Sequence, residues 1–273
     1  MDWAGWNHVR QNTLKWLMCA AIACGWSSIG SAAPLLVVNP GFENIAGLPP
    51  VNEFTFGPLN GWDLYDPDGV TGGGTGNTYF IGTLTPTEEM GNPGTFVNFP
   101  GGAFEGERVG IAFNRAGSHV GNGGGEYGLE QVLADSLQVN TQYTLEVAIG
   151  NIASGTSQAG NFFELSGFPG YRVELLAGGQ VLAMDTNMAL PIDDGEFGIS
   201  TVSFTTGAAH TQLGQALGIR LINTNLQDLG FLSSDLEVDF DAVSLSAVVV
   251  PIPAMLPLMA LLITGMALRA RIS

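Results

Sequence analysis

The chain has 273 residues, 39 of them glycine, and a formal net charge of −17 at neutral pH. Only four of its eight Lys and Arg residues lie between residues 34 and 250, a stretch that holds 24 of the 25 acidic residues. A surface this acidic repels phosphate backbones, which excludes nucleic acids as partners, and it attracts divalent cations. Solubility outside the cell explains the same excess of acidic residues.

The first 33 residues (1–33) have the order of a secretory signal peptide. Arg10 and Lys15 precede an apolar run over residues 16–26, and small residues at 31–33 provide a cleavage site. A retained membrane helix needs roughly 20 apolar residues, about twice the length of this run. Both cysteines of the chain fall inside the predicted signal, so we expect an exported protein without disulfides or cysteine-bound metals.

Residues 248–273 are predicted to form a hydrophobic sorting tail. No charged residue occurs from Ala247 to Leu268, and Arg269 and Arg271 then close the chain. A helix over 253–268 would rise about 24 Å, which is shorter than the ~30 Å hydrocarbon core of a bilayer. Such a transmembrane helix could cross only thinned lipid, with its arginines inside.

The start of this tail carries a resemblance. Val250-Pro251-Ile252-Pro253, followed by the apolar stretch and the terminal arginines, resembles a PEP-CTERM sorting signal in which the middle Glu is replaced. The resemblance implies processing by an exosortase, contact with the membrane through the tail, and a place in the cell envelope or extracellular matrix of a Gram-negative bacterium. An exopolysaccharide or other glycan is then an expected partner.

Residues 34–247 are predicted to form one all-β domain, an antiparallel jelly-roll β-sandwich, between a signal helix and a C-terminal hydrophobic helix. Apolar and polar residues alternate along seven segments, which is the pattern of strands with one buried face. Glycine clusters such as Ala177-Gly178-Gly179 separate them as turns. The segments are Arg108–Phe113, Tyr127–Leu133, Gln142–Ile149, Arg172–Leu176, Ile199–Thr205, Leu217–Asn223 and Glu237–Leu245.

The two ends of this domain predict a calcium site. Asp239 and Asp241 are in register with Val243 and Leu245, so all four are expected on one buried strand face. Buried carboxylates need partners, and with no lysine between residues 34 and 250 a hard cation such as Ca²⁺ is the available one. The alternative is a solvated strand end with both aspartates in water.

A resemblance points to the same site. Asn39-Pro40-Gly41-Phe42-Glu43 and Asp239–Leu245, with Gly61-Trp62 between them, resemble galactose-binding-like and carbohydrate-binding-module jelly rolls over residues 36–246. In that family a structural calcium ion ties the terminal strands together. The resemblance implies Glu43 and Asp241 as its ligands, with backbone carbonyls completing the shell.

A second acidic cluster lies in Gly61–Gly69, where Asp66 and Asp68 follow Asp63. The cluster predicts another cation site, although its spacing lacks the closing Glu of an EF-hand loop. Asp66-Pro67-Asp68-Gly69 fits equally well a turn whose residues are chosen for their backbone angles.

Aromatic residues provide the candidate ligand site. Trp62 is the only tryptophan after the signal, and with Tyr65, Tyr79 and Phe80 it could form a platform for a sugar ring. Aromatic side chains of β-sandwiches are more often core residues, which is the alternative. A second aromatic run, over residues 162–171, either lines a cleft or packs beneath its own loop.

Signatures of catalysis are few. The chain has no Gly-x-Ser-x-Gly elbow, His-Glu-x-x-His helix or phosphate-binding loop, and His119 and His210 are expected on exposed loops. A hydrolase built on two carboxylates stays open. The opening motif and the Gly61–Gly69 segment are also similar to the Stig cyclases of cyanobacteria, which cyclise indole-isonitrile terpenoids. That resemblance implies a pocket acid among aromatic walls, for which Asp239 is a candidate.

Three functions follow from these observations. We expect first a calcium-stabilised, carbohydrate-binding-like module without catalysis. The second hypothesis is an enzyme on the same scaffold, either a Stig-type cyclase of terpenoid indoles or a carboxylate hydrolase of glycans. The third is a structural matrix protein that associates with itself through its sheet edges.

Overall fold

The computed structural model describes residues 31–48, 52–75, 78–115, 125–186 and 190–251. The apolar run of the predicted signal, the sorting tail beyond residue 251 and His119 lie outside these ranges, so their roles stay predictions. Residues Ala32–Val248 form one compact unit. In the ranges that the structure describes, no helix is long and apolar enough to cross a membrane.

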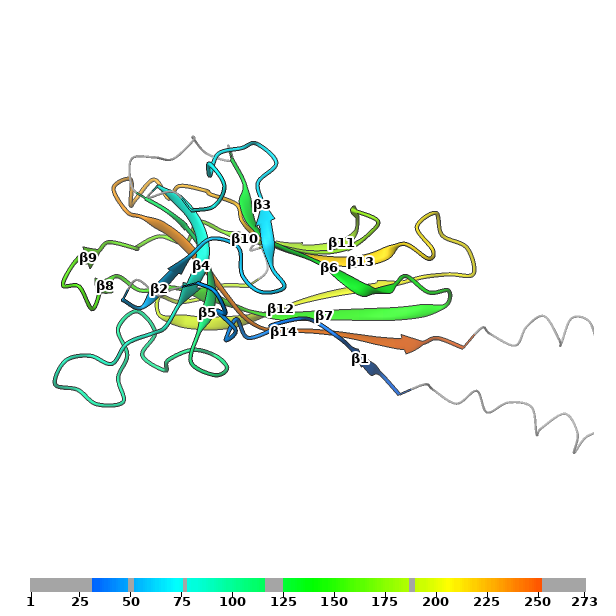
Figure 1. Cartoon of the computed structure of the whole chain (residues 1–273), viewed down its shortest axis with the longest axis horizontal. Helices are drawn as coiled ribbons and strands as arrows, with labels where there is room; N and C mark the ends of the chain where they lie inside the picture. Colours follow the sequence, from blue (N-terminus) through cyan, green and yellow to red (C-terminus); the bar gives the residue numbers. More distant parts are fainter. Residues whose placement is uncertain (1–30, 49–51, 76–77, 116–124, 187–189, 252–273) are drawn as a thin grey trace, which may run out of the picture. The chain divides into compact units, whose positions relative to one another are not determined.

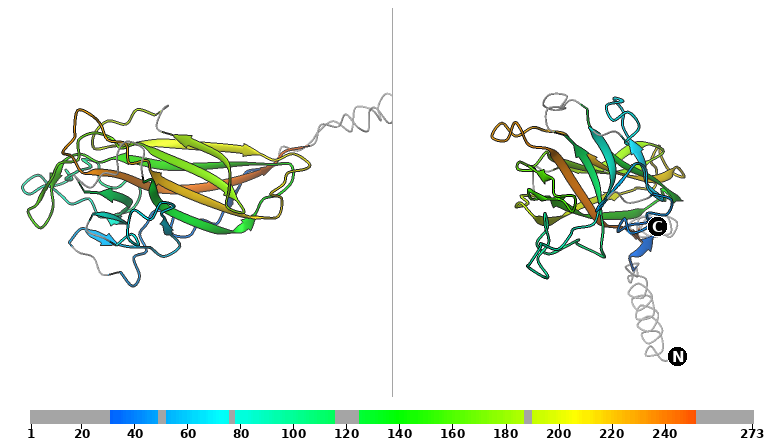
Figure 2. Two further views of the ribbon diagram at one scale, coloured as in Figure 1. Left: turned by 90° about the horizontal axis from the view of Figure 1, so that it is seen from above. Right: turned by 60° about the vertical axis from the view of Figure 1, so that its left-hand side comes forward.

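Two antiparallel sheets face each other in the sandwich (Figures 1 and 2). The larger sheet, in hydrogen-bonded order, contains β12 (Glu196–Thr205), β7 (Thr141–Asn151), β14 (Leu236–Val249), β5 (Val109–Asn114), β4 (Tyr79–Leu84) and β2 (Phe54–Phe56), with β1 (Ala33–Leu35) also paired to β14. The smaller sheet contains β11 (Gln180–Thr186), β10 (Tyr171–Ala177), β13 (Ala216–Asn223), β6 (Tyr127–Ser136) and β3 (Asp63–Tyr65). A short ribbon joins β8 (Gly155–Thr156) to β9 (Phe162–Phe163).

The predicted fold class is confirmed: the domain is an all-β antiparallel sandwich, and each of the seven predicted segments coincides with a strand. The turn predicted at Ala177-Gly178-Gly179 joins β10 to β11, and both glycines have positive φ, 56° and 76°. The short strands β1, β2, β3, β8 and β9 were not predicted, because two or three residues are too few to display an alternation. The longer strands β4 and β11 were not predicted either.

The main core lies between the two sheets. Tyr143, Leu145, Val147 and Ile149 alternate along β7 and are all buried in it, together with side chains of the facing sheet such as Leu221. Glu146, between Leu145 and Val147, points away from this core and is exposed, whereas Ala148 is buried. Burial of these alternate apolar residues is what selects the register of the long strands.

A second apolar cluster covers the outer face of the larger sheet at β4 and β5. Phe80, Ile111 and Phe113 contribute to it from the strands, while Phe99 and Leu165 reach it from loops. The sheet is therefore buried on both faces at this end, unlike a simple sandwich with one solvated face. β2, β8 and β9 lie at the same end of the domain in Figure 1.

Strand β14 changes its buried face partway along. Val238, Phe240 and Val243 all lie in the main core, although strict alternation would place Val243 on the opposite face from Val238 and Phe240. Between them Ala242 has φ of 48°, in the left-handed region, which breaks the alternation. The prediction that Asp239 and Asp241 share the face of Val243 is therefore wrong: both are buried, but on the outer face of the larger sheet.

The approach of β2 to β4 gives a test of this arrangement. A Cβ on Gly82 would lie 1.9 Å from the carbonyl oxygen of Thr55, whereas a Cβ on Gly207 would meet nothing within 4 Å. We expect Gly82→Ala to lower the free energy of unfolding by about 3 kcal/mol, which corresponds to a fall in Tm of roughly 6 to 12 °C. Gly207→Ala is the matched control, and equal melting temperatures by calorimetry would contradict the close pairing.

Candidate functional site

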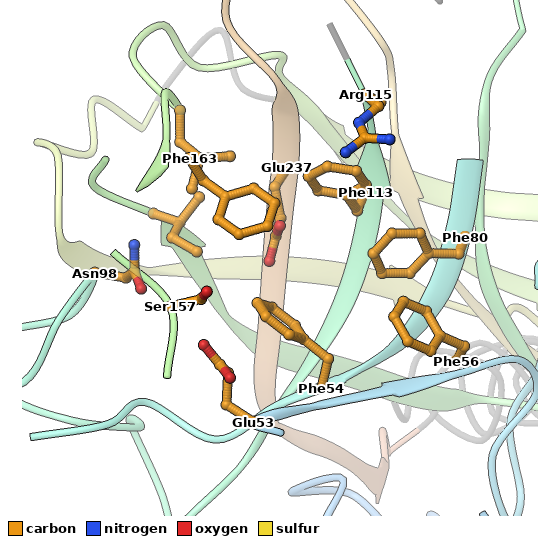
Figure 3. Close-up of a pocket in the computed structure, with 12 residues that line it drawn as sticks. Glu53, Phe54, Phe56, Phe80, Asn98, Phe113, Arg115, Ser157, Phe163 and Glu237 are labelled. Carbon is orange, nitrogen blue, oxygen red and sulfur yellow. The ribbon is translucent and has the colours of Figure 1, made fainter. Parts of the chain in front are cut away.

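A cavity of about 170 Å³ lies on the outer face of the larger sheet, beneath the β8–β9 ribbon (Figure 3). Five phenylalanines dominate its walls, and a few polar side chains project among them. The phenylalanines are Phe54, Phe56, Phe80, Phe113 and Phe163, and the other lining residues are Glu53, Asn98, Arg115, Ile152, Ser157, Leu165 and Glu237. An apolar cavity with a few polar groups is the usual form of a small-molecule site.

The phenylalanine rings contact one another in sequence around the cavity. Phe80 stacks on Phe113 with centroids 4.6 Å apart, and Phe56 meets Phe80 edge-on at the same separation. Phe163 lies 6.3 Å from Phe113 and 6.1 Å from Phe54. Because the rings brace one another, the wall is preformed, and ring faces of this kind attract positive charge.

Glu237 places a carboxyl group among these rings. It lies on β14, is 3% exposed, and its Oε1 atom has no hydrogen-bond partner in the described part of the chain. Burial raises the pKa of Glu237 to about 8, and the charge of Asp235 adds to the rise. At neutral pH the group is therefore largely protonated and able to donate a proton inside an apolar cavity.

Asp239 and Asp241 continue this row of carboxyl groups along β14. Asp239 is fully buried and does not line the cavity. A Cβ on Gly150 would lie 2.9 Å from the Cβ of Asp239, so Asp239 packs closely against that glycine. Burial raises its pKa well above the ordinary value, and the charges of Glu237 and Asp241 raise it further. A side-chain hydrogen bond with Glu237 also raises the pKa of Asp239.

No positive side chain neutralises this row within the ranges described. The four ion pairs found there join Arg172 and Arg220 to Glu126, Glu130 and Glu174 on the smaller sheet. Retention of protons lets the buried Glu237 and Asp239 avoid an unpaired charge in a medium of low polarity.

Glu43 and Asp241 meet where the ends of the domain pair. β1 pairs with the end of β14, and the amide of Val243 donates to the carbonyl of Pro40 at 3.0 Å. A Cβ on Gly41 would lie 3.6 Å from Oδ1 of Asp241 and 3.9 Å from Cγ of Glu43, so both carboxyl side chains flank this glycine. The described residues contain no group of three or more His, Cys, Asp or Glu side chains arranged to hold a metal.

The predicted aromatic platform is dispersed. Trp62 is fully buried in the main core, where it stacks on Phe42 and its Nε1 donates to the carbonyl of Asn39. Tyr79 packs edge-on against Tyr127 in the same core, and Tyr65 lies beneath the guanidinium of Arg220 on the smaller sheet. Of the four platform residues, only Phe80 lines the cavity. Phe163, from the second aromatic run, lines it too.

Asp66 occupies a turn. Its carboxyl oxygens accept hydrogen bonds from the amides of Val70 and Thr71 and from the Thr71 hydroxyl. Partial burial alone would raise the pKa of Asp66, but these bonds outweigh it and hold the pKa below the ordinary value. Gly69 follows with φ of 66°, so the segment has the geometry of the turn interpretation, and Asp68 lies within that turn.

Glu237 is the functional candidate that the sequence argument missed. It opened a predicted strand, but an acid that alternates with Val238 and Phe240 is typical of a solvent-exposed face. The available signal was the run Glu237, Asp239 and Asp241 with no basic residue between, combined with the Phe-Thr-Phe pattern of β2. The acids are buried by loops from distant parts of the chain, and no local sequence pattern predicts that these loops cover them.

The raised pKa of Glu237 makes the stability of the domain depend on pH. The folded state holds this proton more tightly than the unfolded chain, so its contribution is complete below the ordinary pKa of 4.5 and is lost as pH rises through about 8. We expect Tm to fall between about pH 5 and pH 9 in excess EDTA, and Glu237→Gln to flatten that fall. Thermal unfolding across this range, with Glu146→Gln as the exposed-acid control, checks it. An identical slope in Glu237→Gln and wild type would refute the assignment.

The family model described as HpiC1-like, HpiC1 cyclase, matches residues 33–246. The Stig cyclase Fisc from Fischerella sp. TAU, solved with (3Z)-3-(1-methyl-2-pyrrolidinylidene)-3H-indole, is 38% identical with a TM-score of 0.65, over 81% of this chain and 100% of that chain. A cyclase from Fischerella sp. TAU with 4-(1H-indol-3-yl)butan-2-one is 35% identical, with a TM-score of 0.64 and the same coverage. No curated protein matches the chain.

These matches correct one expectation. The hypothesis of a module without catalysis is wrong, because the matched family and the solved structures that resemble this chain over its whole domain are cyclases. A carbohydrate-binding module with β-1,4-galactotriose is only 12% identical, with a TM-score of 0.37, and does not support sugar binding. Since the family model spans residues 33–246, nearly the whole described domain, the chain belongs to the HpiC1-like cyclase family.

Proposed function

We propose that the protein catalyses the acid-initiated cyclisation of an isoprenoid-bearing indole in the phenylalanine-lined cavity, with Glu237 as the proton donor. The observation that carries this proposal is the carboxyl group of Glu237, buried among phenylalanines with a pKa raised to about 8. A general acid works best when its pKa lies near the operating pH. Membership of a cyclase family and the indole compounds in the similar structures support the same substrate class.

The proposed reaction requires only that a proton is added to the substrate and later removed from it. Glu237 donates its proton to a π bond of the substrate, which leaves a positive centre on carbon and a carboxylate on Glu237. A neighbouring π bond attacks that centre and forms the new carbon–carbon bond of the ring. The product then releases a proton, so the overall change is an isomerisation. The faces of Phe80, Phe113 and Phe163 stabilise the positive charge while it lasts.

Asp239 acts on the donor without lining the cavity. It lies two residues along β14 from Glu237. The charge of Glu237 and a side-chain hydrogen bond between the two groups raise the pKa of Asp239, whereas that hydrogen bond lowers the pKa of Glu237. A protonated Asp239 favours ionisation of Glu237 during transfer more than a charged one does, because it adds no second negative charge to the same buried row. Asp239 is therefore a positioning residue in this scheme.

Replacement of the proton donor tests the proposal. With an isonitrile-bearing indole that carries an isoprenoid chain, we expect Glu237→Gln to lower kcat by roughly 100-fold to 10,000-fold, because a general acid contributes that much. The wild-type rate should fall as pH rises past about 8, where Glu237 loses its proton. Product formation followed by chromatography measures both, with Glu146→Gln as control. A Glu237→Gln variant that cyclises at the wild-type rate would remove Glu237 from the mechanism.

We propose further that Glu43 and Asp241 hold a structural calcium ion with backbone carbonyls. The fit rests on their proximity around Gly41 and on the buried state of Asp241. Burial, with smaller contributions from the charges of Glu105 and Glu43, raises the pKa of Asp241 to about 7 in spite of two backbone hydrogen bonds that lower it. A bound cation would relieve this unfavourable burial of charge. Each carboxylate is already oriented, since the amide of Glu105 donates to Asp241 and that of Arg108 to Glu43.

Calcium removal tests this part of the proposal. At about pH 8, calcium at 100 times its dissociation constant would stabilise the folded domain by about 2.7 kcal/mol, a rise in Tm of roughly 5 to 10 °C over protein in EDTA. Glu43→Gln and Asp241→Asn should lose that rise, and Asp68→Asn, in the turn, should keep it. Equal melting temperatures of the wild type in calcium and in EDTA would rule out the ion.

A further inference from the structure

A polar groove adjoins the phenylalanine-lined cavity. The groove has a volume of about 570 Å³ and shares Arg115 and Phe163 with the cavity. Its polar lining residues are Arg115, Asn161, Glu164, Ser233 and Asp235. Sites for drug-sized ligands have volumes of about 300 to 1,000 Å³. The cavity alone, at about 170 Å³, is smaller than that, so an indole with an isoprenoid chain extends from the cavity into the groove.

Arg115 lies where the cavity and the groove meet. It directly follows β5, and its backbone amide donates to the carbonyl of Thr78 at 2.8 Å, which fixes the base of the side chain. Figure 3 shows the guanidinium group beside the ring of Phe113. Within the described part of the chain, this group has no hydrogen bond and no ion pair.

The other three arginines between residues 34 and 250 do have partners. Arg172 and Arg220 form ion pairs with glutamates of the smaller sheet, and Arg108 donates to Oγ1 of Thr83 at 3.2 Å. In a stretch that holds 24 acidic residues, an arginine without a partner is the exception. The N–H donors of Arg115 are therefore open to an acceptor that arrives with a ligand.

The groove favours an uncharged acceptor over an anion. Glu164 and Asp235 line it together with Arg115. The hydroxyls of Ser166 and Ser154 donate to Oε1 of Glu164, and these bonds hold the pKa of Glu164 below its ordinary value, so its carboxylate is charged at neutral pH. A carboxylate on the ligand would meet this like charge, whereas a neutral oxygen would accept from the guanidinium group without that repulsion.

We propose that Arg115 is a specificity-determining residue that donates a hydrogen bond to an uncharged acceptor atom of the substrate, such as a ketone oxygen. This inference rests on the proposed function, because it concerns the polar end of the same substrate. The contact holds that end in the groove, so that the apolar part of the molecule fills the cavity beside Phe113 and Phe163. A molecule without the acceptor makes no such bond and binds less tightly.

Two indoles that differ at one carbon test the contact. 4-(1H-Indol-3-yl)butan-2-one carries a ketone oxygen, and its butyl analogue has a CH₂ group at the same place. The ratio of their affinities, measured by isothermal titration, is compared between the wild type and Arg115→Met, so that differences in the solvation of the probes cancel. We expect Arg115→Met to reduce the preference for the ketone by roughly 10-fold to 100-fold, the range for a hydrogen bond to a charged group. An unchanged ratio, or binding of neither probe to the wild type, would overturn the proposal.

Arg220→Met is the matched control. It removes the same charge and the same side chain from the smaller sheet, outside both the cavity and the groove. The variant should keep the wild-type ratio between the probes. A loss of preference in Arg220→Met as large as that in Arg115→Met would show that the net charge of the protein, and not a contact with Arg115, sets the ratio.

A third probe tests the choice of an uncharged group. The indole propanoate has a carboxylate oxygen in place of the methyl group of the ketone. We expect it to bind the wild type less tightly than the ketone does, and Glu164→Gln to narrow that difference, because the charge of Glu164 lies in the same groove. Tighter binding of the carboxylate than of the ketone would contradict the proposed ligand class.

Failure of this contact and failure of the proposed reaction give different results. A protein whose preference for the ketone depends on Arg115, yet which forms no cyclised product, would support the contact and refute the cyclase reaction. A protein that cyclises its substrate but keeps the wild-type probe ratio in Arg115→Met would do the reverse. Circular dichroism and melting curves show that each variant is folded before the ratios are compared.

Discussion

The site depends on one constraint, the position of the acidic row of β14 inside the domain. Val238 and Phe240 must face the main core, and Glu237, Asp239 and Asp241 are then forced onto the opposite face of the same strand. If water covered that face, the acids would be solvated and their pKa values would not be raised by burial. Here a layer of loops and phenylalanines covers it instead, so the acids lie where charge is disfavoured and protons are held.

The change of face at Ala242 lets one strand serve two purposes. Beyond the left-handed residue, Val243 and Leu245 return to the main core, and the strand end pairs with β1. Without the break, a strand that buried Val238 and Phe240 would turn Val243 and Leu245 to the outside. Such irregularities are common next to active sites because they aim side chains that a regular ladder could not.

Because both faces of the larger sheet are covered, one face packs in the main core and the other carries the cavity. The core between the sheets is closed and holds Trp62, Tyr79 and Tyr127, whose packing fixes the scaffold. The cavity belongs to the outer layer, where loops and short strands bring Glu53, Phe163 and Arg115 to the same rigid sheet. A jelly roll can therefore carry either a binding surface or an enzyme, and the residues of this outer layer decide which.

The sequence by itself determined the fold class, seven of the longer strands and the β10–β11 turn, because alternation and glycine preferences are local properties of the chain, but it did not predict β4 and β11. It also placed the two ends of the domain together through the Glu43 and Asp241 motifs, which flank Gly41. Only the tertiary structure decided that Glu237 is buried, that Trp62 is a core residue, and that Glu53 shares a cavity with Phe163. The cavity depends on contacts between segments far apart in the sequence, such as those of Glu53 and Phe163. Burial, which sets both the pKa and the exposure of a side chain, is a property of the assembled layers.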